Sequence, residues 1–292
     1  MKHMKMTLLA TVISALFLVS CNTPRYAYSP NAHNVPVLTK QFDSKLSANY
    51  STNFDINTES TNGTKYSRNR SNGYDLQGAI AVTNHIGIQG SYFSRKETTH
   101  GDVLSGDSGT VRYKRSMPEF GAGYFAPINK KKSIFFQVFA GVGFGKLNIT
   151  ETARDYNGFS FSRYYASDLF KYYLEPAIIF KSSNESIAGS VSTRLSVLSF
   201  KNVKTNYTMD EKTEYRLDSL NRYSTFFLEP AIVNSFGFNK LPGFRIEYQF
   251  GFSIPLALSS EPILYHRPFN FSLGLVFDIG KLIRGSADRS KD

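Results

Sequence analysis

Ten stretches of this chain alternate between apolar and polar side chains with a period of two, which places successive side chains on opposite faces of a β-sheet. In 244–257, every second residue from Phe244 to Leu256 is apolar or aromatic, and Arg245 and Glu247 lie between them. No helical periodicity follows the first twenty residues. The pattern predicts an all-β chain of about ten antiparallel strands, at 44–54, 73–83, 86–95, 111–126, 133–149, 167–181, 186–202, 223–236, 244–257 and 268–279.

The connections between these strands alternate between long and short. The long ones fall at 55–72, 96–110, 150–166, 203–222 and 258–267, and the short ones at 84–85, 127–132, 182–185 and 237–243. Long external loops and short periplasmic turns are typical of outer-membrane barrels. A soluble β-sandwich alternates polarity in the same way, but nothing makes its connections alternate in length. We therefore predict a transmembrane up-and-down β-barrel with both chain ends on the periplasmic side.

The composition agrees with a barrel. A mean hydropathy of −0.27 is too polar for a bundle of membrane helices, but a barrel combines a polar lumen with an apolar outside. The net charge is +11, yet the basic residues are spread over loops and turns, as in Lys130-Lys131-Lys132. This spread is typical of solvated or lipid-headgroup-facing charge, and nucleic acid is not an expected partner.

The first twenty residues have a basic head and a short apolar run, which is typical of a secretory signal that is later removed. The boundary Leu18-Val19-Ser20-Cys21 is similar to the bacterial lipobox, so Cys21 is the predicted lipidation site. It is the only cysteine, which excludes a disulfide. No acidic run follows it, and we therefore expect a lipid anchor that faces the periplasm.

The predicted organisation has four parts. Residues 1–20 form the lipoprotein signal peptide, 21–43 a lipidated periplasmic linker, 44–279 the barrel and 280–292 a periplasmic C-terminal tail. Prolines at 24, 30 and 36 make the second part extended. It either connects the anchor to the barrel or folds along the periplasmic mouth as a plug.

The chain resembles the outer-membrane β-barrel domain family, in its uncharacterised, lipoprotein-anchored form. The segments that carry the likeness are the lipobox with Cys21, Tyr28–Pro36, Tyr172–Ala177, Phe227–Ala231 and the aromatic closing run Phe269–Phe277. The resemblance covers nearly the whole chain and implies a location and a fold, but no reaction. It also implies the barrel-assembly machinery as a partner, through the aromatic last strand.

Several charged residues share the predicted inner face of the barrel. The lumen polar cluster comprises Asp75, Glu119, Glu175, Arg194, Glu229, Arg245 and Glu247, with Lys45 and the glutamines at 77, 89, 137 and 249 nearby. Buried charges need partners, so we interpret the cluster mainly as a salt-bridged core. The alternative is a proton, cation or substrate path. Pro176 and Pro230 cannot donate to a strand ladder and predict β-bulges.

Three rival interpretations stay open. An outer-membrane enzyme with a rim active site predicts that His100, Asp102, Asp168 and His266 converge. A narrow small-solute channel predicts conductance that depends on Glu175, Glu229 or Arg194, although ten strands leave little room for water. A lipid-tethered periplasmic β-sandwich predicts release into buffer when Cys21 is replaced.

No reaction follows from the motifs. Metal-ligand spacing, a second cysteine and a phosphate-binding glycine loop are missing from the sequence, so we expect no cofactor, no metal and no catalytic residue. Our prediction is a lipid-anchored outer-membrane barrel, embedded in the lipid bilayer, with a structural or surface-binding role. The external loops would bind a glycan or protein ligand.

Overall fold

The computed structural model describes residues 25–54, 70–103, 107–154, 157–182, 186–238, 241–256 and 264–280. Cys21, the signal segment and most of the C-terminal tail therefore lie outside the described residues. The elements are β1 Ser44–Phe54, β2 Ser71–Ala81, β3 Ile86–Val103, β4 Asp107–Pro127, β5 Ile134–Arg154, β6 Ser160–Lys181, β7 Ile187–Thr205, α2 Met209–Glu214, β8 Thr225–Phe238, β9 Leu241–Phe252, β10 Ile254–Leu256 and β11 Phe269–Phe277.

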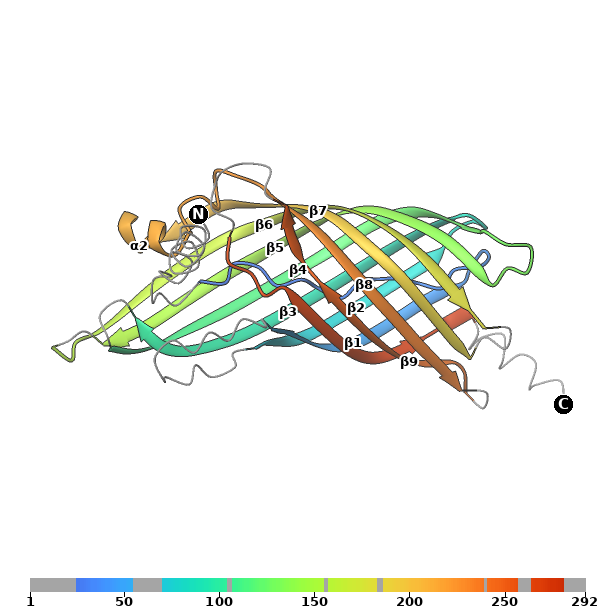
Figure 1. Ribbon diagram of the computed structural model, residues 1–292, viewed down its shortest axis with the longest axis horizontal. Coiled ribbons are helices and arrows are strands. Elements are labelled where there is room, and N and C mark those ends of the chain that lie inside the picture. Colours follow the sequence, from blue (N-terminus) through green and yellow to red (C-terminus); the bar gives the residue numbers. More distant parts are fainter. Residues whose placement is uncertain are drawn as a thin grey trace, which may run out of the picture.

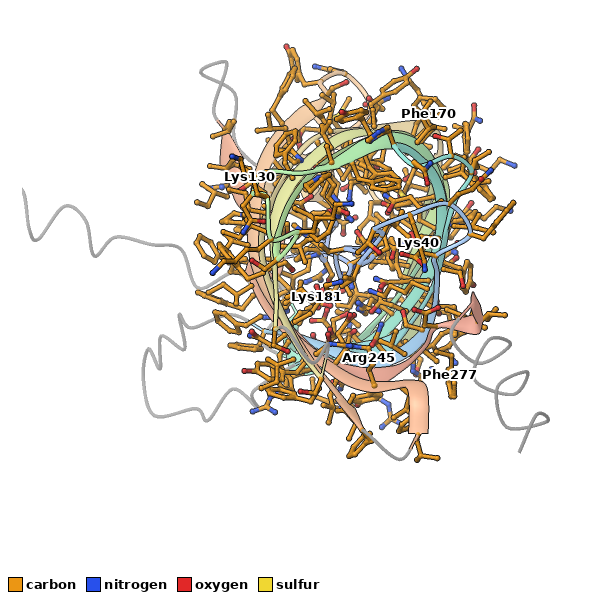
Figure 2. All side chains as sticks on the ribbon, turned by 90° about the vertical axis from the view of Figure 1, so that its right-hand side faces the viewer. Lys40, Lys130, Phe170, Lys181, Arg245 and Phe277 are labelled. Carbon is orange, nitrogen blue, oxygen red and sulfur yellow. The ribbon has the colours of Figure 1, made fainter. Side chains whose placement is uncertain are left out.

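The strands form one closed antiparallel barrel. Strands β1 to β8 pair in chain order, β1 also pairs with β11, β11 pairs with β9, and β9 pairs with β8 to close the ring. The short β10 follows β9 after Ser253 and also pairs with β8. Figure 2 looks along the barrel and shows side chains both inside and outside the ring. The predicted antiparallel barrel of about ten strands is confirmed.

Two of the predicted long connections are wrong. Residues 96–103 continue β3, and 150–154 and 160–166 extend β5 and β6, so these hairpins close at 104–106 and 155–159. Residues 203–205 likewise extend β7. The resulting hairpins project from the end of the barrel that carries α2 (Figure 1). We call this the long-connection end, and the opposite one the short-turn end.

The strands are longer than predicted. The prediction ended them where their outward side chains change from apolar to polar, but the strands continue beyond that point. On β5 the outward side chains are apolar from Phe136 to Phe144 and polar from Lys146 onward. On the inward face, Gln137 and the glycines alternate with the buried Phe135 and Phe139 in the first half, and Leu147 and Ile149, both almost fully buried, follow in the second. Near the long-connection end, β4 to β7 therefore form a β structure with an apolar inside. Its core also includes Tyr207, Tyr215, Leu217 and Leu220 from the connection that carries α2.

The N-terminal segment 25–38 runs through the lumen. All of its residues are buried except Tyr26 and Val37, which are partly buried. Figure 1 shows this coil, in blue, passing inside the barrel from the end near α2 to the opposite end, where β1 begins. The prediction of a periplasmic linker, or of a plug along the periplasmic mouth, differs from this course. The physical reason is that the polar groups of the segment are hydrogen-bonded to those of the lumen wall.

The two prolines do not produce bulges. Neither Pro176 nor Pro230 shifts the register of its strand. The register of the β6–β7 ladder shifts at 166–168, and that of the β8–β9 ladder at 237–238. Instead, the ladder between β6 and β7 keeps its register across an unpaired step at 175–176. In β8, Pro230 pairs with Thr193 of β7. On the side of β8 that faces β9 and β10, residues 229–230 are unpaired. The missing N–H thus leaves a gap in one ladder without changing which side chains face the lumen.

Candidate functional site: the occupied lumen

Three glutamates from alternate strands meet at the middle of the lumen. Glu119 on β4, Glu175 on β6 and Glu229 on β8 are each 1% exposed, so their charges need partners. Arg194 on β7 places Nε and Nη2 2.6 Å from Glu175 Oε2. Lys171 on β6 lies 3.3 Å from Glu119 and 3.6 Å from Glu229. Pairing across strands thus balances most of the buried charge.

The N-terminal segment supplies the remaining partners of this network. The Asn31 amide donates to Glu119 at 2.9 Å, and its oxygen accepts from Arg194 at 2.8 Å and from Lys171 at 3.2 Å. The Tyr28 hydroxyl donates to Glu229 at 2.7 Å and accepts from Lys171 at 3.1 Å. The segment is therefore part of the charge network.

The segment's backbone is also hydrogen-bonded to the wall. His33 N–H donates to Gln249 at 2.7 Å, and the His33 carbonyl accepts from the amides of Gln249 and Gln77, each at 3.2 Å. The His33 ring nitrogen Nδ1 lies 2.8 Å from the Ser192 hydroxyl. Buried backbone groups without partners are costly, and the wall glutamines take the place of a neighbouring strand.

Nine of the ten main strands bind the segment directly. Each contributes a hydrogen bond or ion pair, through Asn53, Asp75, Gly90, Glu119, Glu151, Lys171, Arg194, Glu229 and Gln249 on β1 to β9 in order. Such contacts distributed around the ring fix the segment along the lumen. The occupied lumen is the most elaborate polar site in the part of the chain that the structure describes.

Asp75 forms a smaller cluster beside the segment. Its carboxylate accepts from Arg95 at 2.7 Å, from the Ser51 hydroxyl and from the backbone N–H of Ala32 at 3.3 Å. Arg95 also donates to Asn53, whose amide donates to the Pro30 carbonyl at 2.8 Å. The pair therefore orients the wall groups that hold residues 30–32.

The first residues of the segment are clamped at the long-connection end. Arg25 pairs with Glu151 at 2.9 Å, and the Tyr207 hydroxyl donates to the same carboxylate at 2.6 Å. The guanidinium of Arg25 lies 3.8 Å from the ring centroid of Tyr215, a cation–π contact. Burial raises the pKa of Tyr215 to about 12.

A second clamp holds Tyr26. The guanidinium of Arg267 lies 3.5 Å from its ring centroid, and Arg115 donates to its carbonyl. Both arginines also bind Glu97, Arg267 at 3.1 Å through Nε and Arg115 at 3.4 Å. The segment therefore enters the barrel between charged side chains on β3, β4 and β5, Arg267 just before β11, and two tyrosines of the connection that carries α2.

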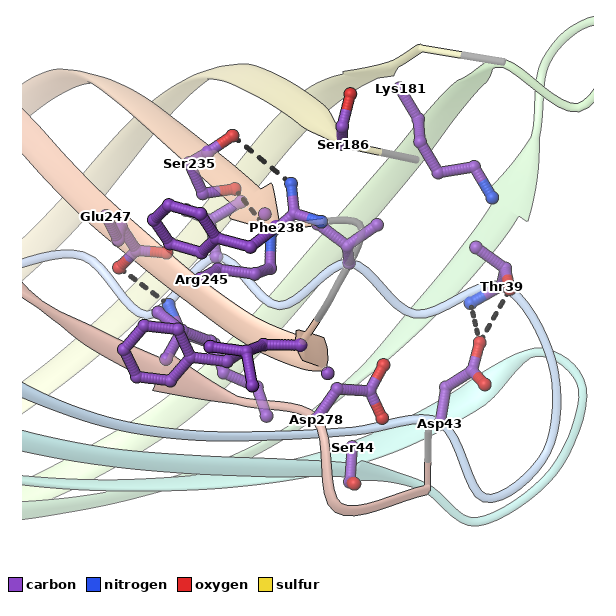
Figure 3. Close-up of a pocket in the computed structure, with 18 of the residues that line it drawn as sticks. Thr39, Asp43, Ser44, Lys181, Ser186, Ser235, Phe238, Arg245, Glu247 and Asp278 are labelled. Atoms are coloured by element: carbon purple, nitrogen blue, oxygen red, sulfur yellow. Dashed lines mark hydrogen bonds and ion pairs between the residues drawn. The ribbon is translucent and has the colours of Figure 1, made fainter. Parts of the chain in front are cut away.

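The short-turn end of the lumen is more open. A cavity of about 570 Å³ lies there, and Val35 and Val37 of the segment are among its lining residues. Figure 3 shows Lys181, Arg245 and Asp278 around it. Arg245 donates to the Ser235 hydroxyl at 3.1 Å, and Asp43 accepts from the Thr39 N–H at 2.9 Å. The last bond fixes the turn through which the segment leaves the lumen and enters β1.

The seven residues predicted for the lumen cluster all belong to the inner wall. Glu119, Glu175, Arg194 and Glu229 come together, whereas Asp75 pairs with Arg95 in its own cluster. Glu247 pairs with Lys45 at 2.9 Å, and both Glu247 and Arg245 line the short-turn cavity.

Sequence reasoning missed Lys171, Arg95 and the course of the N-terminal segment through the whole lumen. Lys171 has the same parity as Glu175 on one strand, a signal that could have placed it in the lumen. Arg95 stands at the end of its predicted strand, two residues from Phe93, which is also buried.

The enzyme alternative predicts that His100, Asp102, Asp168 and His266 converge, but His100, Asp168 and His266 each bind a different partner. His100 is exposed on β3 and contacts Thr110. Asp168, on the outward face of β6, accepts from Asn202 at 2.7 Å, and the His266 ring bonds the Ser253 carbonyl at 3.1 Å. Two strands separate β3 from β6, which puts these strands ~14 Å apart at ~4.8 Å per step. The side chain of Asp102 lies outside the described residues.

Two absences hold for the described part of the chain. It contains no group of three or more His, Cys, Asp and Glu side chains arranged to hold a metal ion. No helix within the same ranges is long and apolar enough to cross a membrane.

Comparison with known proteins gives structural similarity only. No family model and no curated protein matches the sequence. Among solved structures the chain is similar to the attachment invasion locus protein Ail of Yersinia pestis, with 13% identity over 81% of this chain and 98% of that one, and a TM-score of 0.33. A deltaS2 mutant of the TodX monoaromatic hydrocarbon channel shows 8% identity over 87% and 96%, with a TM-score of 0.35.

The NanC porin shows 9% identity over 80% of this chain and 99% of that one, with a TM-score of 0.27. At TM-scores below 0.5, these similarities do not assign a function.

Proposed function

We propose that this protein is a lipid-anchored outer-membrane barrel that its own N-terminal segment closes, with a structural or surface-binding role at its long-connection end. The observation that carries the proposal is the segment 25–38, which is bonded to nine strands inside an apolar-coated barrel. A barrel filled in this way is a membrane-embedded platform, and no reaction is assigned to it.

The outer surface supports the membrane part of the proposal. Outward side chains of β6 are apolar or aromatic from Phe170 to Phe180, and polar groups follow at Asp168 and Ser162. At ~3.3 Å per residue and a tilt of ~40°, this stretch is ~25 Å high. That height matches the apolar band of transmembrane barrels. A contiguous exposed apolar surface of this extent is unfavourable in water.

The charged lumen supports the closed state. A channel needs a continuous polar path, whereas here Asn31 and Tyr28 occupy the space between Lys171, Arg194 and the three glutamates. We therefore expect the intact protein to give no ion-conductance steps in planar bilayers. Steps that change when Glu175 or Arg194 is neutralised would support the channel alternative instead.

The surface-binding part rests on the inverted half of β4 to β7. Its outside is polar and projects beyond the apolar band, which suits contact with a glycan or a protein. Biogenesis would use the barrel-assembly machinery, through the aromatic strand β11 that closes the ring against β1.

Fractionation of a Cys21→Ala variant, exported by a non-lipoprotein signal peptide, tests membrane spanning and lipidation separately. We expect it to stay in the outer membrane and to shift on SDS gels when heated, because the apolar band holds it there. The wild-type chain should carry the mass of an acylated Cys21. Recovery of the variant as soluble, folded periplasmic protein would overturn the barrel in favour of the tethered β-sandwich.

A further inference from the structure

The course of segment 25–38 has a defined direction along the barrel axis. Arg25 binds Glu151 near the long-connection end of β5. Farther along the segment, Val35 packs on Phe135 and Ile179, which lie at the short-turn end of β5 and β6. Thr39 then binds Asp43 just before β1 begins. The chain therefore enters the lumen at the long-connection end, where Arg25 lies.

The height of this entry point can be compared with the apolar band. Arg115, which holds the Tyr26 carbonyl, lies five residues beyond Phe120, the last aromatic residue on the outward face of β4. With a rise of ~3.3 Å per residue and a tilt of ~40°, Tyr26 lies ~13 Å beyond the near edge of the band. The far edge is then ~38 Å away, because the band is ~25 Å high.

Cys21 stands five residues before Tyr26. Five extended residues span at most ~17 Å. The near edge of the band is within that reach, and the far edge is not. An anchor in the leaflet at the short-turn end would require the segment to leave the lumen and break its bonds to the wall.

We propose that the acylated Cys21 inserts into the leaflet at the long-connection end, which is the outer leaflet, so that the N-terminus crosses the membrane inside its own barrel. The proposal rests on the lipidation and outer-membrane location proposed above. It replaces the expected periplasmic anchor, because the lumen, and not the periplasm, holds residues 25–38. The lipid and the long connections then lie on the same face of the membrane.

An epitope peptide inserted between Asn22 and Thr23 tests this orientation. On intact cells, an antibody that does not cross the outer membrane should label it as strongly as after permeabilisation. The same epitope between Tyr156 and Asn157, at the tip of the β5–β6 hairpin, is the exposed control. Insertion between Lys130 and Lys131, in a short turn, is the periplasmic control and should be labelled only after permeabilisation.

The outcomes separate the two proposals. Labelling of the N-terminal epitope only after permeabilisation, with both controls behaving as expected, overturns the orientation while the barrel stands. Failure of the two controls to differ overturns membrane spanning itself. A wild-type chain without the mass of the acyl groups overturns lipidation alone. In a Cys21→Ala background the N-terminal epitope should still be labelled on intact cells, because the lumen contacts set the direction.

Discussion

Arg194 forms the shortest ion pair at the centre of the lumen, with Glu175 at 2.6 Å. It binds Glu175 through two nitrogens and also contacts Asn31 and Glu119. Because it is buried, its removal would leave carboxylates without compensation in a dry site. The network therefore depends on this residue as much for the charge that it neutralises as for the contacts that it makes.

We expect Arg194→Met to lower the free energy of unfolding by about 3–5 kcal/mol, the cost of breaking a buried ion pair. Arg112→Met, at an exposed position on β4, should change it by less than about 0.5 kcal/mol. Urea titration of the refolded barrel in lipid vesicles measures both. Equal effects of the two substitutions would contradict the assigned role of Arg194.

Gly141 marks a close approach of two strands and a tyrosine. A Cβ there would lie 2.3 Å from the Phe120 carbonyl oxygen and 2.6 Å from the Tyr173 side chain. Gly141→Ala should cost about 1–3 kcal/mol of stability through overpacking. Gly78→Ala, whose Cβ would have its nearest neighbour at 3.9 Å, is the control and should be tolerated. The temperature of the gel shift on heating reports both, and a stable Gly141→Ala barrel would argue against this packing.

The strands themselves divide into a membrane part and a projecting part. On β5, Ala140 and Thr150 both point outward and are exposed, but they lie on opposite sides of the change in polarity. Ala140→Lys should cost about 2–4 kcal/mol, because it puts a charge on the lipid face near the middle of the band. Thr150→Lys should be nearly neutral. Unfolding of both variants in phospholipid vesicles tests where the bilayer ends, and equal costs would contradict the proposed boundary.

At this scale the sequence predicted the strands and the direction of their side chains well. A period of two directly encodes the two faces of a strand, so Glu119, Glu175 and Glu229 could be assigned to one face without any structure. The same parity continues into 96–100 and 150–154 with polar residues outward. The predicted ends of these strands are therefore too early. The prediction required apolar residues on the outer face, as if lipid surrounded the strands along their whole length.

The course of segment 25–38 could not be predicted from its own residues. It lacks periodicity, and its Asn, His and Pro content is equally typical of an exposed linker. A segment in the lumen differs from an exposed linker only by the wall groups that bind its backbone, such as Gln77, Gln249 and Asp75. The β-bulge predicted at Pro176 was wrong, because a strand ladder can lose one hydrogen bond without a shift in register.

For the whole molecule, the closed ring and the buried segment depend on each other. Lys171, Glu119 and Glu229 each lose a hydrogen-bond partner when Tyr28 and Asn31 are not in place. Conversely, a segment of this polarity is buried only inside a wall that supplies matching donors and acceptors.

The most direct test of the occupied lumen is a disulfide trap between segment and wall. The chain without Cys21 has no other cysteine, so His33→Cys and Ser192→Cys can be combined in a Cys21→Ala background. Their native side chains approach within 2.8 Å, and we expect the pair to cross-link in the membrane-embedded protein. His33→Cys combined with Lys131→Cys, in a short turn, is the control and should stay reduced. Absence of the first cross-link under oxidising conditions in a folded, heat-shifting barrel would contradict the presence of the segment in the lumen.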